Sequence, residues 1–164
     1  MEIEGSKNIR GSASQYYVAA ELSRRNIIAA LTTGNCPNTD ILCSNAEGTR
    51  FAHVQVKTFE KGKKKCAVGM KAEREYTGQF FWILVGIPKA DDLAGSIIYY
   101  VIPASDMANH VVASANLFKS DPSHDQENTF RAVRIPPQIN RDGWSIAEYE
   151  GRWDLIKDAL SASG

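Results

Sequence analysis

The sequence predicts an α/β fold with a central mixed β-sheet flanked by helices, and three stretches of the chain support that prediction. Residues 12–25 are apolar around much of a helical circumference, which favours a helix packed on a core. Residues 79–87 form a continuous apolar run ended by Pro88, the pattern of a strand buried on both faces. Residues 40–57 read as two short strands joined by a turn. With 164 residues the chain is long enough for a substantial core, so we expect a single domain over residues 1–164.

The two short strands place polar side chains together. Side chains alternate between the faces of a strand, so His53, Gln55 and Lys57 share one face while apolar residues occupy the other. The preceding strand opens with Asp40, and the Asn-Ala-Glu-Gly turn at 45–48 is typical of a hairpin. Directly opposite residues in an antiparallel pair lie about 4.5 to 5.5 Å apart. We therefore expect the Asp40 carboxylate and the Gln55 amide oxygen to share one divalent ion, with Lys57 beside it.

This pattern resembles the active-site signature of the PD-(D/E)xK nuclease superfamily: an acid at a strand start, then an acid or glutamine, any residue and a lysine on the hairpin partner. Asp40, Gln55 and Lys57 fill its three positions, with Gln55 where an acid is commoner. The family also places a glutamate on its first helix, a position that Glu21 fills here. The order of these residues is similar to that of the Mrr-like branch with its Q-x-K variant. The resemblance covers residues 11–60.

The resemblance implies a restriction-endonuclease-like core with the element order αβββαβ. It further implies a Mg²⁺-dependent endonuclease, with Mn²⁺ as an alternative ion, that hydrolyses phosphodiester bonds in DNA. Glu21, Asp40 and Gln55 would organise the metal and the attacking water, and Lys57 would stabilise the transition state. Magnesium prefers hard oxygen ligands and keeps several of its waters, which suits this set. Because Gln55 removes one negative charge, we expect weak metal binding in the absence of DNA.

The same residues also have purely structural explanations. A polar strand face is what a solvated sheet edge presents, and Glu21 has Arg24 and Arg25 as ion-pair partners within one helical turn. The alternative function is a catalytically silent module that keeps the nuclease fold and binds nucleic acid or protein within a larger assembly. That alternative predicts binding without cleavage and no metal requirement.

A lysine-rich loop follows the proposed catalytic strand. Nineteen basic and nineteen acidic residues balance over the whole chain, so any positive field must be local. The loop supplies one, since Lys57 is followed by Lys61, Lys63, Lys64 and Lys65. We expect these four loop lysines to bind the DNA backbone and to make binding salt-dependent. The alternative is an ordinary solvated hairpin tip.

The rest of the chain is expected to be scaffold. Residues 96–102 predict a buried strand that pairs with 79–87 as a hairpin. After Pro103 the spacing predicts a helix capped by Ser105 or Asp106.

The last third of the sequence predicts a polar loop, a short strand and a helix. The loop spans 119–129 and the strand 130–135, while Ser145 and Glu148 fit the capping box of a C-terminal helix. Aromatic side chains can stack on unpaired bases, but their spacing here favours a place in the core. These aromatic residues are Trp144, Tyr149 and Trp153.

Other function classes lack their usual residues. Three scattered histidines and three cysteines without C-x-x-C spacing argue against a zinc site or a disulfide framework. P-loop, serine-hydrolase and zinc-protease motifs are missing from the sequence. Its apolar runs are too short for a membrane span or a signal peptide, so we expect a cytoplasmic protein without membrane contact. Because cutting both strands of a duplex can use two sites, we also expect a homodimer, or a partner subunit that supplies target recognition.

Overall fold

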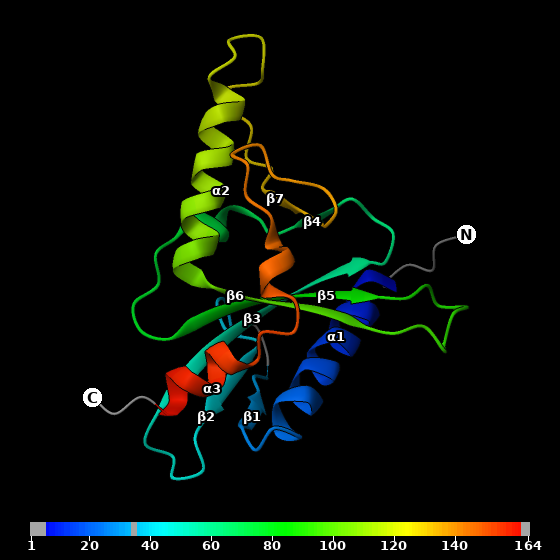
Figure 1. The fold of residues 1–164 in the computed structure, drawn as a ribbon, viewed down its shortest axis with the longest axis vertical. Helices are drawn as coiled ribbons and strands as arrows, with labels where there is room; N and C mark the ends of the chain where they lie inside the picture. The colour runs from blue at the N-terminus through cyan, green and yellow to red at the C-terminus, as the bar shows by residue number, and fades with distance from the viewer. Residues whose placement is uncertain (1–5, 34–35, 162–164) are drawn as a thin grey trace.

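The structure is a computed structural model that describes residues 6–33 and 36–161. Its elements in chain order are α1 (Ser6–Ser23), β1 (Ile28–Leu31), β2 (Ile41–Ser44), β3 (Phe51–Glu60), β4 (Lys65–Ala67), the 3₁₀ helix η1 (Met70–Glu73), β5 (Phe80–Ile87), β6 (Ile98–Pro103), α2 (Ala104–Lys119), β7 (Ala132–Arg134), the 3₁₀ helix η2 (Ile146–Tyr149) and α3 (Asp154–Ser161). Five strands form the main sheet in the order β1-β2-β3-β5-β6, and β4 pairs with β7 in a separate two-stranded sheet (Figure 1).

The main sheet is mixed, because β3 and β5 run parallel while its other neighbouring pairs are antiparallel. Helices cover both faces of this sheet. Residues of α1 and α3 share one core with the sheet, and residues of α2, β4 and β7 share the other (Figure 1). The predicted fold class, a central mixed sheet flanked by helices, is thereby confirmed. The connection between the parallel strands β3 and β5 contains β4 and η1, and the helix α2 follows β6.

The apolar run at 79–87 becomes β5, whose eight residues are all buried. β5 lies between β3 and β6, and alternate side chains enter the two cores. β3 shows the alternation that the sequence predicts. Val54 and Val56 pack against α1, while Gln55 and Lys57 point to the face that α2 covers.

Gly86 in β5 leaves room for the ring of Phe59. A Cβ atom built on Gly86 would lie 2.6 Å from the Cζ atom of Phe59, and this ring is buried. We expect Gly86→Ala to lower the free energy of unfolding by about 1–3 kcal/mol, because overpacking forces the ring or the strand to move. Urea unfolding checks this. The control is Gly11→Ala in α1, where a Cβ meets nothing within 4 Å; alanine should stabilise that helix by about 0.5–1 kcal/mol.

Two helix-capping predictions need correction. α2 begins at Ala104 directly after Pro103, so Ser105 and Asp106 lie in its first turn and neither caps it. Asp106 instead accepts a 2.8 Å hydrogen bond from the Tyr149 hydroxyl. Ser145 does cap a helix, since its Oγ accepts from the N–H of Ala147, but that helix is the short η2. The C-terminal α-helix starts later, at Asp154.

In the last third of the chain, the predicted strand needs correction and the predicted core positions of two tryptophans are confirmed. The strand expected at 130–135 shortens to β7, and it pairs with β4 rather than joining the main sheet. The core assignment of Trp144 and Trp153 is confirmed, because they are 7% and 6% exposed.

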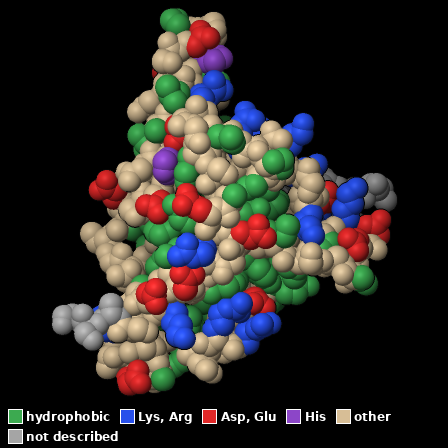
Figure 2. Space-filling model, in the orientation of Figure 1, with side chains coloured by type: hydrophobic (Ala, Val, Ile, Leu, Met, Phe, Trp, Pro, Cys, Tyr) green, Lys and Arg blue, Asp and Glu red, His purple; other side chains and the backbone are tan. Residues whose placement is uncertain are grey.

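The outside of the protein has no dominant charge in the face that Figure 2 presents. Acidic and basic side chains are interspersed there, in keeping with the balance of nineteen of each sign. Among the described residues, none of the helices combines the length and the apolarity that crossing a bilayer requires.

Candidate active site

Asp40 lies directly before β2 and next to the middle of the neighbouring strand β3. Its backbone is fixed on both sides, because its N–H donates to the carbonyl of Val54 at 2.9 Å and its carbonyl accepts from the N–H of Thr32 at 3.0 Å. β2 and β3 are antiparallel with Ile41 opposite Val54, which puts Asp40 beside Gln55. The hairpin geometry expected from the sequence is therefore confirmed.

The Asp40 carboxylate is held by β3 through one oxygen. Oδ2 accepts the backbone N–H of Val56 at 2.7 Å and also accepts from Nε2 of Gln55. Within residues 6–33 and 36–161, Oδ1 accepts no hydrogen bond. Because the Gln55 amide donates through its nitrogen, Oδ1 of Asp40 and Oε1 of Gln55 are the two oxygens left for another partner.

Burial raises the pKa of Asp40, and this effect outweighs four influences that lower it. These are the hydrogen bond from Val56 and the positive charges of Lys57 and Lys71, in that order, with a smaller contribution from Gln55. The protein therefore compensates this carboxylate incompletely. A partly desolvated carboxylate of this kind gains from a nearby cation.

Lys57 lies two residues beyond Gln55 on the same face of β3. Its Nζ atom is 5.9 Å from the centroid of the Trp82 ring, which is fully buried. Trp82 is paired with Gln55 across β3 and β5, so it forms the floor beneath both polar side chains. The Trp82 ring thus supports the ammonium group, whose positive charge also lowers the pKa of Asp40.

Lys71 in η1 is a neighbour of Asp40 that the sequence does not reveal. Its charge lowers the pKa of Asp40, and its Nζ donates to the carbonyl of Pro37, three residues before the aspartate. No local pattern marks this lysine. Lys71 lies in the connection between β3 and β5, and this connection folds back toward Asp40 in the tertiary structure.

The structure does not bring Glu21 to the other three predicted residues. Its carboxylate accepts from Arg25 at 2.5 Å and from Arg24 at 3.4 Å. Burial first, and the charge of Glu21 second, raise the pKa of Tyr99 to about 12. Tyr99 is in β6, at one edge of the sheet, so Glu21 lies toward that edge. β2 and Asp40 lie toward the opposite edge.

The other flank of α1 faces β1. In a helix with 3.6 residues per turn, Gln15 and Ala19 lie across the helix from Tyr17 and Glu21. Ala19 packs on the same core as residues of β1. Gln15 is half-buried. It is therefore a half-buried polar residue on the flank of α1 toward β1.

The site contains few acidic ligands. Within the described chain, no group of three His, Cys, Asp or Glu side chains is placed to hold a metal ion. Asp40 and Gln55 offer one charged and one neutral oxygen donor. A divalent ion here would take its remaining ligands from water and from a substrate phosphate.

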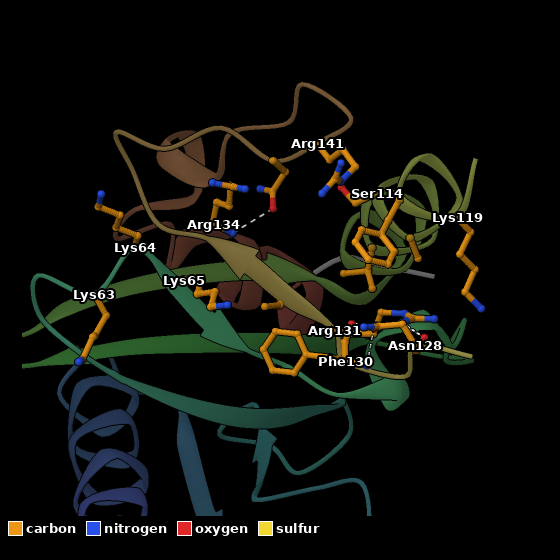
Figure 3. A pocket seen from close by; sticks show the side chains of 15 residues that line it. Lys63, Lys64, Lys65, Ser114, Lys119, Asn128, Phe130, Arg131, Arg134 and Arg141 are labelled. Atoms are coloured by element: carbon orange, nitrogen blue, oxygen red, sulfur yellow. Dashed lines mark hydrogen bonds between the residues drawn. The ribbon is translucent and has the colours of Figure 1, made fainter. Parts of the chain in front are cut away.

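The lysine-rich loop divides into two parts in the structure. Lys61 turns to the segment before β6, where its Nζ donates to the carbonyl oxygen and the hydroxyl of Ser96 at 2.9 and 3.0 Å. Lys63, Lys64 and Lys65 instead line a groove between β4, β7 and α2 (Figure 3).

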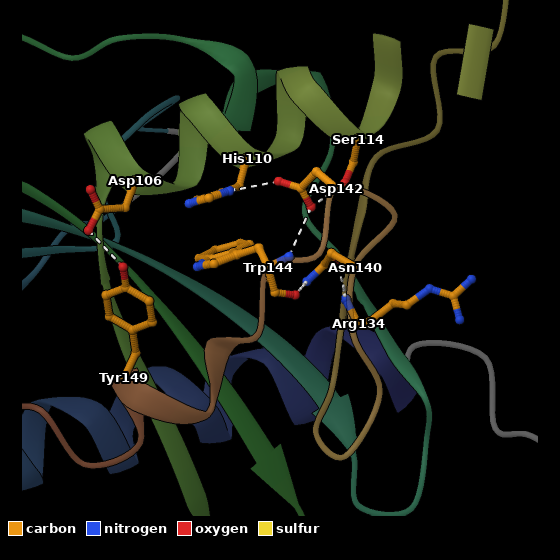
Figure 4. A network of polar contacts seen from close by, with 8 residues as sticks. All are labelled: Asp106, His110, Ser114, Arg134, Asn140, Asp142, Trp144 and Tyr149. Carbon is orange, nitrogen blue, oxygen red and sulfur yellow. Dashed lines mark hydrogen bonds and ion pairs between the residues drawn. The ribbon is translucent and has the colours of Figure 1, made fainter. Parts of the chain in front are cut away.

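The segment after β7 is tied to α2 by a polar network (Figure 4). Asp142 accepts from Nδ1 of His110 at 2.7 Å and from the Ser114 hydroxyl at 3.0 Å. The His110 ring stacks on Trp144, with 4.3 Å between ring centroids. Asn140 completes the network, since its Nδ2 donates to the carbonyl of Trp144 at 3.1 Å. This network fixes the chain on either side of residue 141.

We expect Asp142→Asn to lower the free energy of unfolding by about 1–3 kcal/mol at neutral pH. Burial raises the pKa of Asp142, but the hydrogen bonds from His110 and Ser114 and from the N–H of Trp144 outweigh it and hold the pKa below its usual value. A lowered pKa stabilises the fold above the ordinary pKa, and this contribution is lost as the pH falls through the lowered one.

Urea unfolding of wild type and variant between about pH 7 and pH 2 checks this, because the difference should shrink in the acidic range. Asp158→Asn on the exposed face of α3 is the matched control, with an expected effect within about 0.5 kcal/mol. A constant difference at all pH values would contradict the explanation.

The fold is similar to that of a solved nuclease. A bacterial homing endonuclease, I-Ssp6803I, matches with a TM-score of 0.58 and 17% sequence identity, over 98% of this chain and 100% of that chain. A Holliday junction resolvase, Hjc from the archaeal hyperthermophile Archaeoglobus fulgidus, matches with a TM-score of 0.42 and 11% identity, over 76% and 84% of the two chains. No protein-family model and no curated protein sequence matches this chain. At 17% identity, the similarity to the homing endonuclease establishes that the two proteins share a fold.

Proposed function

We propose that this protein is a metal-dependent endonuclease that hydrolyses phosphodiester bonds in DNA. The observation that carries the proposal is the meeting of Asp40, Gln55 and Lys57 beside β3, with the carboxylate oriented by the N–H of Val56. The shared fold with a homing endonuclease over nearly the whole chain supports the same proposal.

The residues present fit a hard divalent ion. Oδ1 of Asp40 and Oε1 of Gln55 would hold Mg²⁺, because both are oxygen donors and the carboxylate is incompletely compensated. Mn²⁺ accepts the same kind of ligand. The chemistry that such an ion supplies is neutralisation of the phosphate and a nucleophilic water at neutral pH. Glu21 is left out of this ligand set, because it is paired with Arg25 on another side of the sheet.

The remaining chemistry belongs to the chain itself. Lys57 would place its ammonium against a non-bridging oxygen of the scissile phosphate, where negative charge develops in the transition state. Asp40 would stay oriented throughout, since its backbone is hydrogen-bonded to Val54 of β3 and to Thr32. One oxygen of its carboxylate is also bonded to β3. Lys71 would add a second positive charge on the same side of the site.

A catalytically silent nucleic-acid-binding module is the second candidate, and one observation favours it. In the described part of the chain, Asp40 is the one carboxylate joined by hydrogen bonds to Gln55 and β3. A site with a single acidic ligand binds a divalent ion weakly, so the fold could serve for binding alone.

Cleavage assays separate the two candidates. Labelled duplex, branched and single-stranded DNA, with RNA as a comparison, would be incubated with the protein in Mg²⁺, Mn²⁺ or EDTA. We expect cutting of DNA with either metal and none in EDTA. Binding without cutting under every metal condition would instead support the silent module, or a nuclease that needs a partner subunit. Gel filtration of the active species would test the homodimer.

Gln55→Glu should strengthen metal binding in the absence of DNA. The substitution puts a second carboxylate next to Asp40, so the two like charges repel without metal and share an ion with it. In EDTA we expect the variant to be less stable than wild type by about 1 kcal/mol and to melt at a lower temperature. Adding Mg²⁺ should raise its melting temperature more than that of wild type. Thermal unfolding with and without the metal measures both effects.

Gln55→Met is the control, because it keeps the length of the side chain and removes its oxygen. It should show no rise in melting temperature with Mg²⁺. Equal responses of wild type, Gln55→Glu and Gln55→Met to the metal would contradict a metal site at Gln55.

A further inference from the structure

A groove of about 650 Å³ lies between the C-terminal half of α2 and the two-stranded β4–β7 sheet (Figure 3). Seven of the nineteen lysines and arginines of the chain line it, and no Asp or Glu of the described chain is among its lining residues. The seven cations are Lys63, Lys64, Lys65, Lys119, Arg131, Arg134 and Arg141. A protein without net charge thus concentrates more than a third of its positive charge in one concavity.

These charges are largely uncompensated. In the described part of the chain, Arg131 is the one groove cation that forms an ion pair, with Glu73 of η1. Lys65 instead lies over the ring of Phe130, with its Nζ 5.0 Å from the centroid. The Cζ atom of Arg141 lies 5.1 Å from the centroid of the Phe118 ring. A cation on an aromatic face keeps its full charge. The concave wall then concentrates the positive field.

The backbone that carries the arginines is fixed in place. Asn140 accepts the N–H of Arg134 on its Oδ1 atom at 2.9 Å (Figure 4). Asp142, directly after Arg141, is bound to two side chains of α2. The groove is therefore preformed, and an anion entering it does not have to order the surrounding chain.

The chemistry of the lining selects the occupant. A site without carboxylates does not suit a metal ion, and a single phosphate would meet few of the cations, because they come from α2, from β4 and from both sides of β7. A chain of several phosphates is long enough to contact cations from all of these elements. Phe130, which is 55% exposed, and Phe118 add apolar surface that suits the sugars between phosphates.

The groove adjoins the candidate active site along the chain and in space. β4 begins five residues after the end of β3, and the thiol of Cys66 in β4 lies 3.9 Å from the carbonyl of Thr58 in β3. Lys63, Lys64 and Lys65 therefore follow Lys57 around the end of β3, and the groove lies next to the candidate active site.

We infer that this groove binds the phosphate backbone of the DNA substrate beside the site of cleavage. The inference rests on the proposed nuclease function. It assigns Arg134, Arg141 and Lys119 to DNA binding together with Lys63, Lys64 and Lys65. Lys61 stays outside the groove, because it is bonded to Ser96.

The test measures binding of the full chain to fluorescein-labelled duplex DNA by fluorescence anisotropy, in EDTA so that no cleavage occurs. The groove variant is Lys64→Gln/Arg134→Gln/Arg141→Gln, whose side chains are all exposed. The matched control, Lys89→Gln/Arg152→Gln/Lys157→Gln, removes the same charge from exposed positions elsewhere. A second groove variant, Lys64→Gln/Lys119→Gln, leaves β7 and its flank intact in case the triple variant unfolds. Circular dichroism checks the fold of each.

We expect the triple groove variant to bind roughly 10- to 100-fold more weakly than wild type at about 100 mM NaCl. The slope of log affinity against log salt should fall by about 2–3, since each lost phosphate contact lowers it by about 0.9. The double variant should show about two thirds of that slope change. The control should stay within about threefold, because salt screens charges beyond about 10 Å.

Equal losses in the groove variant and in the control would overturn the inference. So would competition by polyglutamate as effective as that of unlabelled duplex, because the groove would then be a site for acidic protein. Failure of the proposed function has a different signature. Wild type that binds DNA through the groove but never cleaves it would support the silent module, or a nuclease that needs a partner subunit, and would leave the groove assignment standing.

Discussion

Lys57→Ala should lower the rate of DNA cleavage by about 10²- to 10³-fold while leaving the protein folded. The ammonium group lies beside Asp40 on the face of β3 that carries Gln55, and its loss removes the positive charge from the developing charge on the phosphate. A loss of this size equals about 3–4 kcal/mol of transition-state stabilisation. Single-turnover cleavage of a labelled duplex at saturating protein concentration measures it, because binding then no longer limits the rate.

Lys57→Met is the control that separates charge from packing. Methionine keeps the apolar stem over Trp82 but carries no charge, so it should lose as much activity as alanine. Wild-type melting temperatures in both variants would show that the fold is intact. Full activity in Lys57→Met would contradict an electrostatic role for Lys57.

Asp40→Asn should abolish metal-dependent cleavage, with a loss of about 10³-fold or more. Asparagine can still accept the N–H of Val56 through its side-chain oxygen, so the position of the side chain should survive while the one negative metal ligand is removed. Burial of the Asp40 carboxylate also costs free energy in the wild type, so we expect the variant to be at least as stable without metal.

Two measurements test this prediction together. Cleavage in Mg²⁺ and Mn²⁺ should both be lost, and the rise in melting temperature on adding metal should disappear with them. Glu21→Gln is the informative comparison, because Glu21 is paired with Arg25 away from the site. It should keep most of the cleavage rate. A loss in Glu21→Gln as large as in Asp40→Asn would return the helix glutamate to the metal site.

The sequence was enough for the parts of the protein that depend on local periodicity. The alternation in β3 put Gln55 and Lys57 on one face, and the turn before it fixed the antiparallel register that brings Asp40 to Gln55. The unbroken apolar run of β5 predicted burial on both faces. In each case the spacing of side chains along a strand decides which neighbours they meet.

Periodicity failed where a side chain had more than one partner within reach. It places Glu21 on a helix, but which flank of α1 meets β2 depends on how the helix packs against the sheet. It offers Asp106 as a cap, but Tyr149 competes for that carboxylate from 43 residues away.

The groove shows the same limit on a larger scale. The sequence contains the lysine run at 63–65, yet the other cations of the groove follow more than fifty residues later and carry no local signal. They meet the lysines because β7 pairs with β4 and because Asp142 ties the following segment to α2. The sequence by itself determined the strands β2, β3, β5 and β6, their faces and the polar trio of Asp40, Gln55 and Lys57. The packing of distant segments decided which charges gather around them, because contacts between segments far apart in the chain leave no periodic trace in it.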